Sequence, residues 1–341
     1  MSIEPTSALT FGDLLLETAR EMGVAFYGED GTEEAQIPVD PHDLSEVMRH
    51  VNNAVRMFVA DAPPAGWRWT RPVASIALWP SVAVDATKTV TGGTYESASD
   101  QTLLTANSSV FYESMEEKSI VVTGQGTFTI KRYVSATQVY VHGNHSFAAA
   151  STYSIATDGN YTLPRTFAGT HDGQITFAAD TNRGVSPGWT DEATIRSLRE
   201  DINSNSGPPI LFAATVFQGE GQRRRYTLMA YPTPEEVFTA QFPFDVHFDK
   251  MVDIDEVPPT PLVHDETLRA ACIAVVERDV DDTPNGPKMG YYQKCIGSSQ
   301  RADARSAPAK LGYFGNGRGR FNSIQDVRRW LTRPTVRYNT P

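Results

Sequence analysis

The sequence predicts an α+β protein: a helical bundle body, an inserted antiparallel β-barrel or β-sandwich domain, and an extended C-terminal tail. Three observations predict this class. Apolar residues recur at helical spacing near both ends of the chain, before residue 72 and after residue 264. Between residues 73 and 165, short runs of β-branched and aromatic residues alternate with turn residues. The last 37 residues are basic, whereas the rest of the chain is acidic.

The first predicted helix begins at Thr10, whose hydroxyl can cap free N–H groups of the first turn. Asp13 complements the helix dipole in that turn, and Gly23 suits a C-terminal cap. A second helix opens at Asp40-Pro41, because Asp is a favoured N-cap and Pro a favoured first helical residue. These signals predict that residues 1–72 form the N-terminal helical part of the body.

The segment 73–165 is predicted to be the inserted β domain. Candidate strands include residues 119–123, 127–130 and 138–141, with turns rich in Gly, Asn and Asp between them. Short strands at such regular spacing are typical of a small antiparallel barrel or sandwich.

Residues 166–304 have mixed character and are predicted to complete the body. Strands are expected near 174–177, 210–217, 226–231 and 241–249, with a helix opening at Thr190. Two further helices are expected after His264 and around 289–307. Since helices lie on both sides of an all-β segment, we expect the helices of the two ends to pack together.

The C-terminal segment 305–341 is predicted to be a basic docking arm. It holds seven Arg and one Lys against Asp326, a charge of +7, while the whole chain carries −11. Residues 1–304 therefore carry −18, from −11 minus +7. A segment with so little apolar surface cannot build its own core, so we expect it either to stay loose or to fold against something else.

The sequence contains few motifs typical of catalysis, cofactor binding or metal binding. It contains no phosphate-binding P-loop, no dinucleotide-binding fingerprint and no nucleophile elbow, and the two cysteines lack metal-site spacing. His142 and His145 flank a predicted turn, where a metal site would need further ligands, so we expect exposed turn histidines. No catalytic, cofactor or metal site is predicted, and no stretch is apolar enough to predict a membrane span.

Two charged runs leave alternatives open. Arg223-Arg224-Arg225 opens a predicted strand and is expected to be solvent-exposed, with a protein interface or a DNA contact as alternatives. An acidic run is expected to form a solvated face; it could also line a channel or supply the carboxylate pair of a hydrolase. Its members are Asp245, Asp249, Asp253, Asp255 and Glu256.

Several stretches, in a fixed order, resemble the head-to-tail adaptor (connector) proteins of tailed bacteriophages, including the podophage type called tail tubular protein A. They are Leu44, Val47, Val51, Asn52, Ala54 and Arg56 running into Trp67 and Trp69; Phe111–Glu116, Ile120–Gly124, Gly126–Ile130 and Tyr133–Thr137; Tyr161–Pro164; Gly207–Pro209; Tyr231-Pro232 and Pro234; and the helix from His264. The resemblance covers most of residues 10–305 and leaves out the tail.

The resemblance implies a structural, non-enzymatic protein of the virion neck, made in the host cytoplasm. Such adaptors form a ring, commonly of twelve copies, beneath the portal protein. The ring extends the channel through which genomic DNA passes on ejection without specific binding, and it offers a docking site to a tail, nozzle or tail-terminator protein. No cofactor and no membrane are involved.

The tail is expected to be the portal-docking arm, because in several adaptors a C-terminal extension contacts the portal ring. The planar guanidinium of Arg can bind a carboxylate through two hydrogen bonds, and aromatic side chains are typical anchors of protein interfaces. The predicted docking residues are Arg318, Arg320, Phe321, Ile324, Val327, Arg328, Arg329, Trp330, Leu331, Arg333 and Tyr338. Within the same class, a lower neck or tail-tube component is an alternative to the portal-bound adaptor.

Three other classes stay open. The β segment would also suit a host-receptor or carbohydrate-binding tail protein, although its aromatic residues alternate as core residues would. A hydrolase could use Asp245 and Asp249. A nucleic-acid binder could use the Arg-rich tail, and its affinity would then fall steeply with salt.

Overall fold

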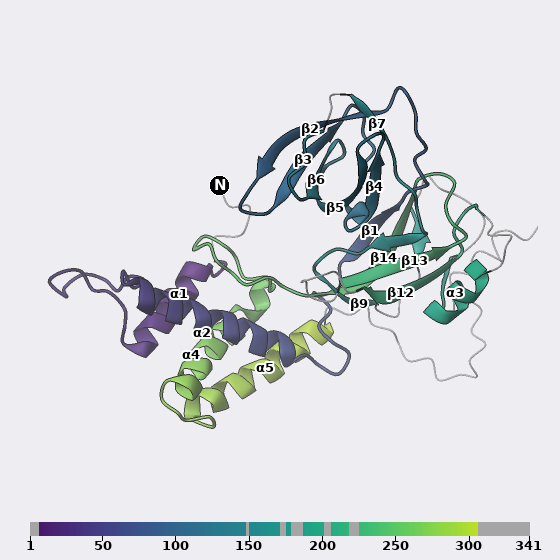
Figure 1. The fold of residues 1–341 in the computed structure, drawn as a ribbon. Helices are drawn as coiled ribbons and strands as arrows, with labels where there is room; N and C mark the ends of the chain where they lie inside the picture. Colours follow the sequence, from purple (N-terminus) through teal and green to yellow (C-terminus); the bar gives the residue numbers. More distant parts are fainter. Residues whose placement is uncertain are drawn as a thin grey trace, which may run out of the picture.

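The computed structural model describes residues 7–147, 150–170, 175–178, 187–200, 206–217 and 225–305. Within these residues the protein combines five α-helices with β-sheets that include a closed six-stranded antiparallel barrel. Four helices lie together at one end of the molecule, and the strands lie at the other (Figure 1). Each end has its own large apolar core. None of the helices in these ranges has the length and hydropathy needed to cross a bilayer.

The helical end is formed by segments from both ends of the chain, as the sequence predicted. Its helices are α1 (Phe11–Met22), α2 (Pro41–Ala60), α4 (Asp265–Asp279) and α5 (Pro287–Arg305). Helix α4 packs against the other three and is buried on several sides. One apolar cluster joins Phe11 of α1, Val51 of α2, Leu268 of α4 and Tyr292 of α5.

The predicted helix ends are confirmed. The Thr10 hydroxyl accepts the Asp13 N–H at 3.2 Å, and the Asp13 carboxylate accepts the Thr10 N–H at 2.9 Å, which completes a capping box. Gly23 closes α1 in the left-handed conformation, with φ of 73°. Asp40 accepts the His42 N–H at 2.7 Å, with Pro41 as first residue of α2.

Trp67 covers the end of α2. Its ring stacks on Phe58 with centroids 5.0 Å apart, and its indole N–H donates to the Val59 carbonyl at 3.1 Å. Trp69 and the buried His264 extend this aromatic cluster. The cluster closes the helical core on the side where the chain leaves for the β domain.

The barrel confirms the antiparallel β insertion. Its strands follow the spatial order β2-β3-β6-β5-β4-β7 and close on themselves. They are β2 (Thr89–Glu96), β3 (Gln101–Ala106), β4 (Ser119–Val122), β5 (Gly126–Ser135), β6 (Gln138–His142) and β7 (Ser151–Ser154). Alternate residues such as Leu104, Ile120 and Val141 fill the interior, because successive side chains of a strand point to opposite faces.

Two further sheets lie outside the barrel. One contains β1 (Val73–Leu78), β14 (Phe238–Val246), β9 (Phe167–Thr170) and β10 (Thr176–Phe177); the other contains β11 (Gly188–Trp189), β12 (Leu211–Phe217), β13 (Arg225–Tyr231) and β8 (Asn160–Thr162). Strand β1 pairs with β14 and strand β8 with β13. Strands on both sides of residue 165 therefore share sheets, and the barrel itself spans residues 89–154.

Short elements complete the fold. Helix α3 (Glu192–Glu200) packs on β12 and β13, and Ile195 is its buried anchor. One 3₁₀ turn, η1 (Glu113–Met115), contacts the barrel strand β5 as well as β1 and β8 outside it. Another, η2 (Leu262–His264), leads directly into α4. These turns lie where the larger parts of the molecule meet.

Candidate functional site

The predicted docking residues of the tail, Arg318 to Tyr338, lie outside the described residues. The described chain ends at Arg305, the last residue of α5. Among the described residues, the candidate site is the connector, which we define as residues 247–261 between β14 and η2. It carries most of the predicted acidic run and joins the strands to the helices.

Asp245 differs from the rest of the acidic run. It lies in β14 just before the connector, and its carboxylate accepts the Arg71 Nε–H at 3.0 Å. The ladder between the two chain segments continues there, because the Val246 N–H donates to the Thr70 carbonyl at 3.1 Å. Asp245 is therefore paired with a cation, whereas Asp249, Asp253, Asp255 and Glu256 are exposed.

Asn52 of α2 fixes one side of the connector. Its side-chain amide accepts the Met251 N–H at 2.8 Å and donates to the Met251 carbonyl at 3.1 Å. This pair of hydrogen bonds satisfies both backbone groups of Met251, whose side chain is buried in the helical core. The resemblance had pointed to Asn52 without assigning it a contact.

The first turn of α1 fixes the other side. The N–H of Phe11 donates to the Glu256 carbonyl at 2.7 Å, and the N–H of Gly12 donates to the Ile254 carbonyl at 2.9 Å. The first N–H groups of a helix have no partner within the helix, so the connector supplies acceptors for two of them. A Cβ atom on Gly12 would lie 2.7 Å from Ile254 Cγ2, which leaves room only for glycine.

The pinned connector presents apolar and acidic side chains alternately to solvent. Val252 and Ile254 are 58% and 47% exposed, and Asp253 and Asp255 are exposed beside them. Asp253 also accepts the Asp255 N–H at 3.3 Å, which fixes the local turn. A rigid surface of exposed aliphatic groups with an acidic surround is typical of a protein-binding site.

A shallow groove of about 220 Å³ runs between α2 and the start of the connector. Val55 and Val59 form its apolar wall on the α2 side, and Phe248 faces them from the connector. Arg56, Lys250 and Asp249 are its charged lining residues, which gives the lining a charge of +1. The groove therefore has a different charge from the acidic stretch that follows it.

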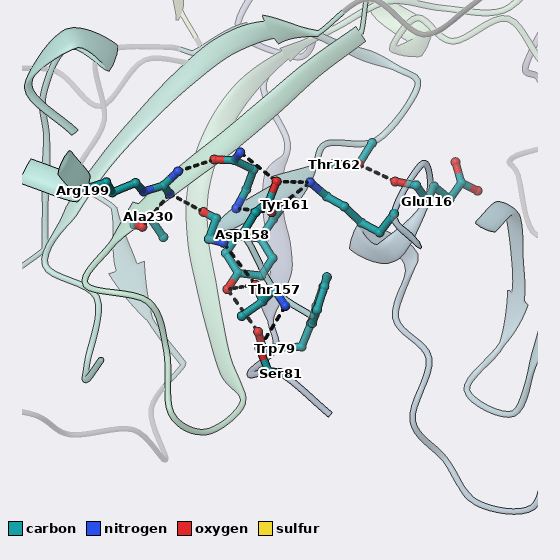
Figure 2. Close-up of polar contacts among 12 residues, drawn as sticks. Trp79, Ser81, Glu116, Thr157, Asp158, Tyr161, Thr162, Arg199 and Ala230 are labelled. Atoms are coloured by element: carbon teal, nitrogen blue, oxygen red, sulfur yellow. Dashed lines mark hydrogen bonds and ion pairs between the residues drawn. The ribbon is translucent and has the colours of Figure 1, made fainter. Parts of the chain in front are cut away.

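A polar cluster joins α3 to the sheets (Figure 2). Arg199 donates to the Asn160 side chain at 2.7 Å and to the carbonyls of Gly159 and Ala230 at 2.8 and 3.0 Å. Asp158 in turn accepts from the Asn160 N–H at 3.0 Å. Burial lowers the pKa of Arg199, although the nearby Asp158 opposes that change.

The same cluster reaches the barrel side through Tyr161 and Lys118. Tyr161 donates its hydroxyl hydrogen to the Trp79 carbonyl at 3.1 Å, and burial raises the pKa of this phenol. Lys118 pairs with Asp158 at 3.1 Å. These side chains bind one another and the backbone. We therefore interpret the cluster as a structural contact that holds α3 and the sheet of β8, β11, β12 and β13 against the barrel, rather than as a site for a ligand.

Sequence reasoning missed the buried pair of Glu116 and Arg225. The expected exposure of the Arg223–Arg225 run is wrong at Arg225, which is 9% exposed; Arg223 and Arg224 lie outside the described residues. Arg225 donates to Glu116 at 3.0 Å and to the Leu163 carbonyl at 3.3 Å. Glu116 also accepts the Tyr133 N–H at 3.0 Å. The partners are 109 residues apart, so no local pattern signalled the pair.

Of the two histidines expected in an exposed turn, His142 is the last residue of β6, and His145 lies half-buried in the turn after it. His142 is exposed and lies 3.5 Å from Asp100, and the His145 ring contacts the His142 carbonyl at 2.8 Å. Within the described ranges, no cluster of His, Cys, Asp and Glu has the geometry to hold a metal ion. Cys272 and Cys295 are free thiols.

Comparisons with known proteins add no family. No protein-family model matches the chain, and no curated protein matches its sequence.

Proposed function

We propose that the protein is a structural head-to-tail adaptor of a bacteriophage neck, which assembles as a ring, with twelve copies as the expected number, beneath the portal protein. The observation that carries the proposal is the connector, because hydrogen bonds on both sides hold its exposed aliphatic and acidic side chains in place for contact with another subunit. The ordered resemblance to adaptor proteins supports the same class. In this proposal the helical end is the bundle body of the ring.

The charge distribution supports a channel function. Residues 1–304 carry −18, and each added copy in a ring would repeat that charge. Clustered negative charge repels DNA phosphates and keeps a passing duplex mobile. We propose that Asp249, Asp253, Asp255 and Glu256 contribute to this surface, whereas Asp245 serves mainly to hold Arg71.

The barrel aromatic residues support a structural function over a carbohydrate platform. Phe111 is buried, and Tyr112, Phe128 and Tyr133 pack against the β core. A sugar-binding platform needs exposed aromatic faces, so this packing favours a barrel that provides a docking surface for the next tail component.

The tail is proposed as the portal-docking arm, with Phe321, Trp330 and Leu331 as apolar anchors and its arginines against portal carboxylates. Many copies around a ring would add avidity to a weak single contact. The ordering cost of the arm would be met on binding.

Mass measurement of the full chain mixed with the portal protein tests the proposal. We expect complexes heavier than the portal ring by several copies of this chain. Deletion of residues 306–341 should abolish docking, while the circular dichroism of the remaining chain stays helical. The double variant Phe321→Ala with Trp330→Ala should weaken docking, and Tyr313→Ala, outside the predicted docking residues, is the matched control. A full chain that stays monomeric at high concentration with portal present would overturn the ring proposal.

A further inference from the structure

A second, larger groove lies between α1 and the start of α4. Its volume is about 570 Å³. Leu9, Leu14, Leu16 and Leu262 supply its apolar lining. Leu262 and the adjacent Val263 remain 42% and 63% exposed, so apolar surface extends beyond the groove.

Carboxylates dominate the polar lining of this groove. Asp13, Glu17, Asp265 and Glu266 face a single lining cation, Arg269, which gives the lining a charge of −3. Arg269 lies 3.3 Å from the half-buried Glu17 and 3.8 Å from the exposed Glu266, so one guanidinium serves two acids.

The remaining two acids have structural tasks. Asp13 caps α1, and Asp265 accepts the Leu9 N–H at 3.2 Å. Burial raises the pKa of Asp265. Glu17 and Glu266 are therefore the lining acids best placed to bind a further cation.

The described chain ends at Arg305 of α5, a helix that contacts two elements lining the groove. Helix α5 packs along α4, with Ser299 and Thr267 hydroxyls 2.6 Å apart, and it also contacts η2, which contains Leu262. Near its end, Asp303 accepts the Arg68 N–H at 3.3 Å. Residues 306–341 follow Arg305 in the sequence. They carry six Arg and one Lys against Asp326, a charge of +6, together with Phe321, Trp330 and Leu331.

We propose that the groove between α1 and α4 binds residues 318–333 of the same chain. Trp330 and Leu331 would cover the apolar lining, and the neighbouring Arg328 and Arg329 would pair with Glu17 and Glu266. Charge complementarity and the covalent tether to Arg305 support this occupant, since a tethered segment has a high effective concentration. The inference does not depend on the ring proposal, because groove and segment belong to one chain. Since the same residues are proposed to dock on the portal, the segment would occupy the groove in the free chain and leave it on docking.

Residues 1–6 are the competing occupant, because Ser7 and Leu9 line the groove. That segment holds Glu4 and neither Lys nor Arg, so its charge does not complement the lining.

Site-specific photo-crosslinking of the full-length chain tests this proposal. A benzophenone amino acid at position 330 should cross-link to peptides that contain Leu9–Leu16 or Leu262–Arg269. A mixture of isotopically light and heavy chains should give cross-links within one chain. Because the expected attraction is between exposed charges, the yield should fall in 1 M salt.

The variant Glu17→Gln with Glu266→Gln should lower the yield about three- to tenfold, the effect of losing two surface ion pairs. Glu29→Gln with Glu34→Gln removes two exposed acids that do not line the groove, and should leave the yield unchanged. The salt series on the unaltered chain gives an answer even if a variant folds poorly. The proposal would be overturned by cross-links to other parts of the chain or by cross-links only between chains. It would also be overturned if a benzophenone at position 3 cross-linked to the groove and one at position 330 did not.

Discussion

At the scale of single residues, the buried pair of Glu116 and Arg225 is the most consequential contact. Removing one member of a buried pair leaves an unpaired charge, so Arg225→Met should lower the free energy of unfolding by about 3 kcal/mol. Urea denaturation measures this loss. Arg165→Met is a matched control, because Arg165 approaches the same carboxylate at 3.7 Å but is 59% exposed; it should change stability by about 0.5 kcal/mol or less. Equal losses in the two variants would contradict this account, and adding Glu116→Gln to Arg225→Met should restore part of the stability.

His264 predicts a pH dependence of stability. Burial lowers the pKa of His264, whose ring packs at tilted angles against Phe58, Trp67 and Trp69. The unfolded chain therefore binds a proton near pH 6.5 that the folded chain takes up only at lower pH, so stability falls as the pH drops below about 6.5. His264→Phe should therefore make the loss of stability between pH 7 and 5.5 smaller, as measured by urea denaturation at several pH values. Burial also lowers the pKa of His50, so the stability of His264→Phe should still fall with decreasing pH, but less steeply than that of the unaltered chain. The exposed His142→Phe is the control; an unchanged slope in His264→Phe would refute the assignment.

At the scale of elements, the docking of the connector on α1 depends on Gly12. In Gly12→Ala the new methyl group would collide with Ile254, and overpacking of this kind costs about 1–3 kcal/mol. Adding Ile254→Ala should recover much of the loss in a thermal melt. Gly290→Ala in α5 is the control: a Cβ there meets no atom within 4 Å, so the same change should stabilise its helix by about 0.5–1 kcal/mol. Destabilisation by both alanines would indicate a general intolerance instead.

Local elements were predictable, and distant pairings were not. The Thr10 N-cap and the Asp40-Pro41 start are signals within one turn of helix, and both occur as predicted. Short alternating runs also indicated the barrel. Alternation shows which face of a strand is buried and does not name its neighbour, so the pairings of β1 with β14 and of β8 with β13 could not be read. The contacts of Asn52 with Met251 and of Arg225 with Glu116 could not be predicted either, because they join residues 199 and 109 positions apart.

At the scale of the whole molecule, the two cores should respond separately to substitution. Leu268 in the helical core and Leu104 in the barrel are both fully buried. Each Leu→Ala change should cost about 2–5 kcal/mol. Hydrogen exchange measured by mass spectrometry should show faster exchange in α1, α2, α4 and α5 for Leu268→Ala, and in the barrel strands for Leu104→Ala. Faster exchange throughout the chain in either variant would mean that the cores unfold as one unit.

The pairing of β1 with β14 means that all the described strands, residues 73–246, are inserted into the helical end through two neighbouring strands. The chain leaves the helices along β1 and returns along β14, and the register from Val73↔Pro243 to Leu78↔Phe238 keeps outgoing and returning strands side by side. Directly opposed residues in such a ladder lie only about 4.5–5.5 Å apart. A tight hairpin joining the two strands would therefore span the gap without moving the helices. Evolution could accordingly lengthen, exchange or delete the domain at this stem while leaving the surfaces of the helical end unchanged.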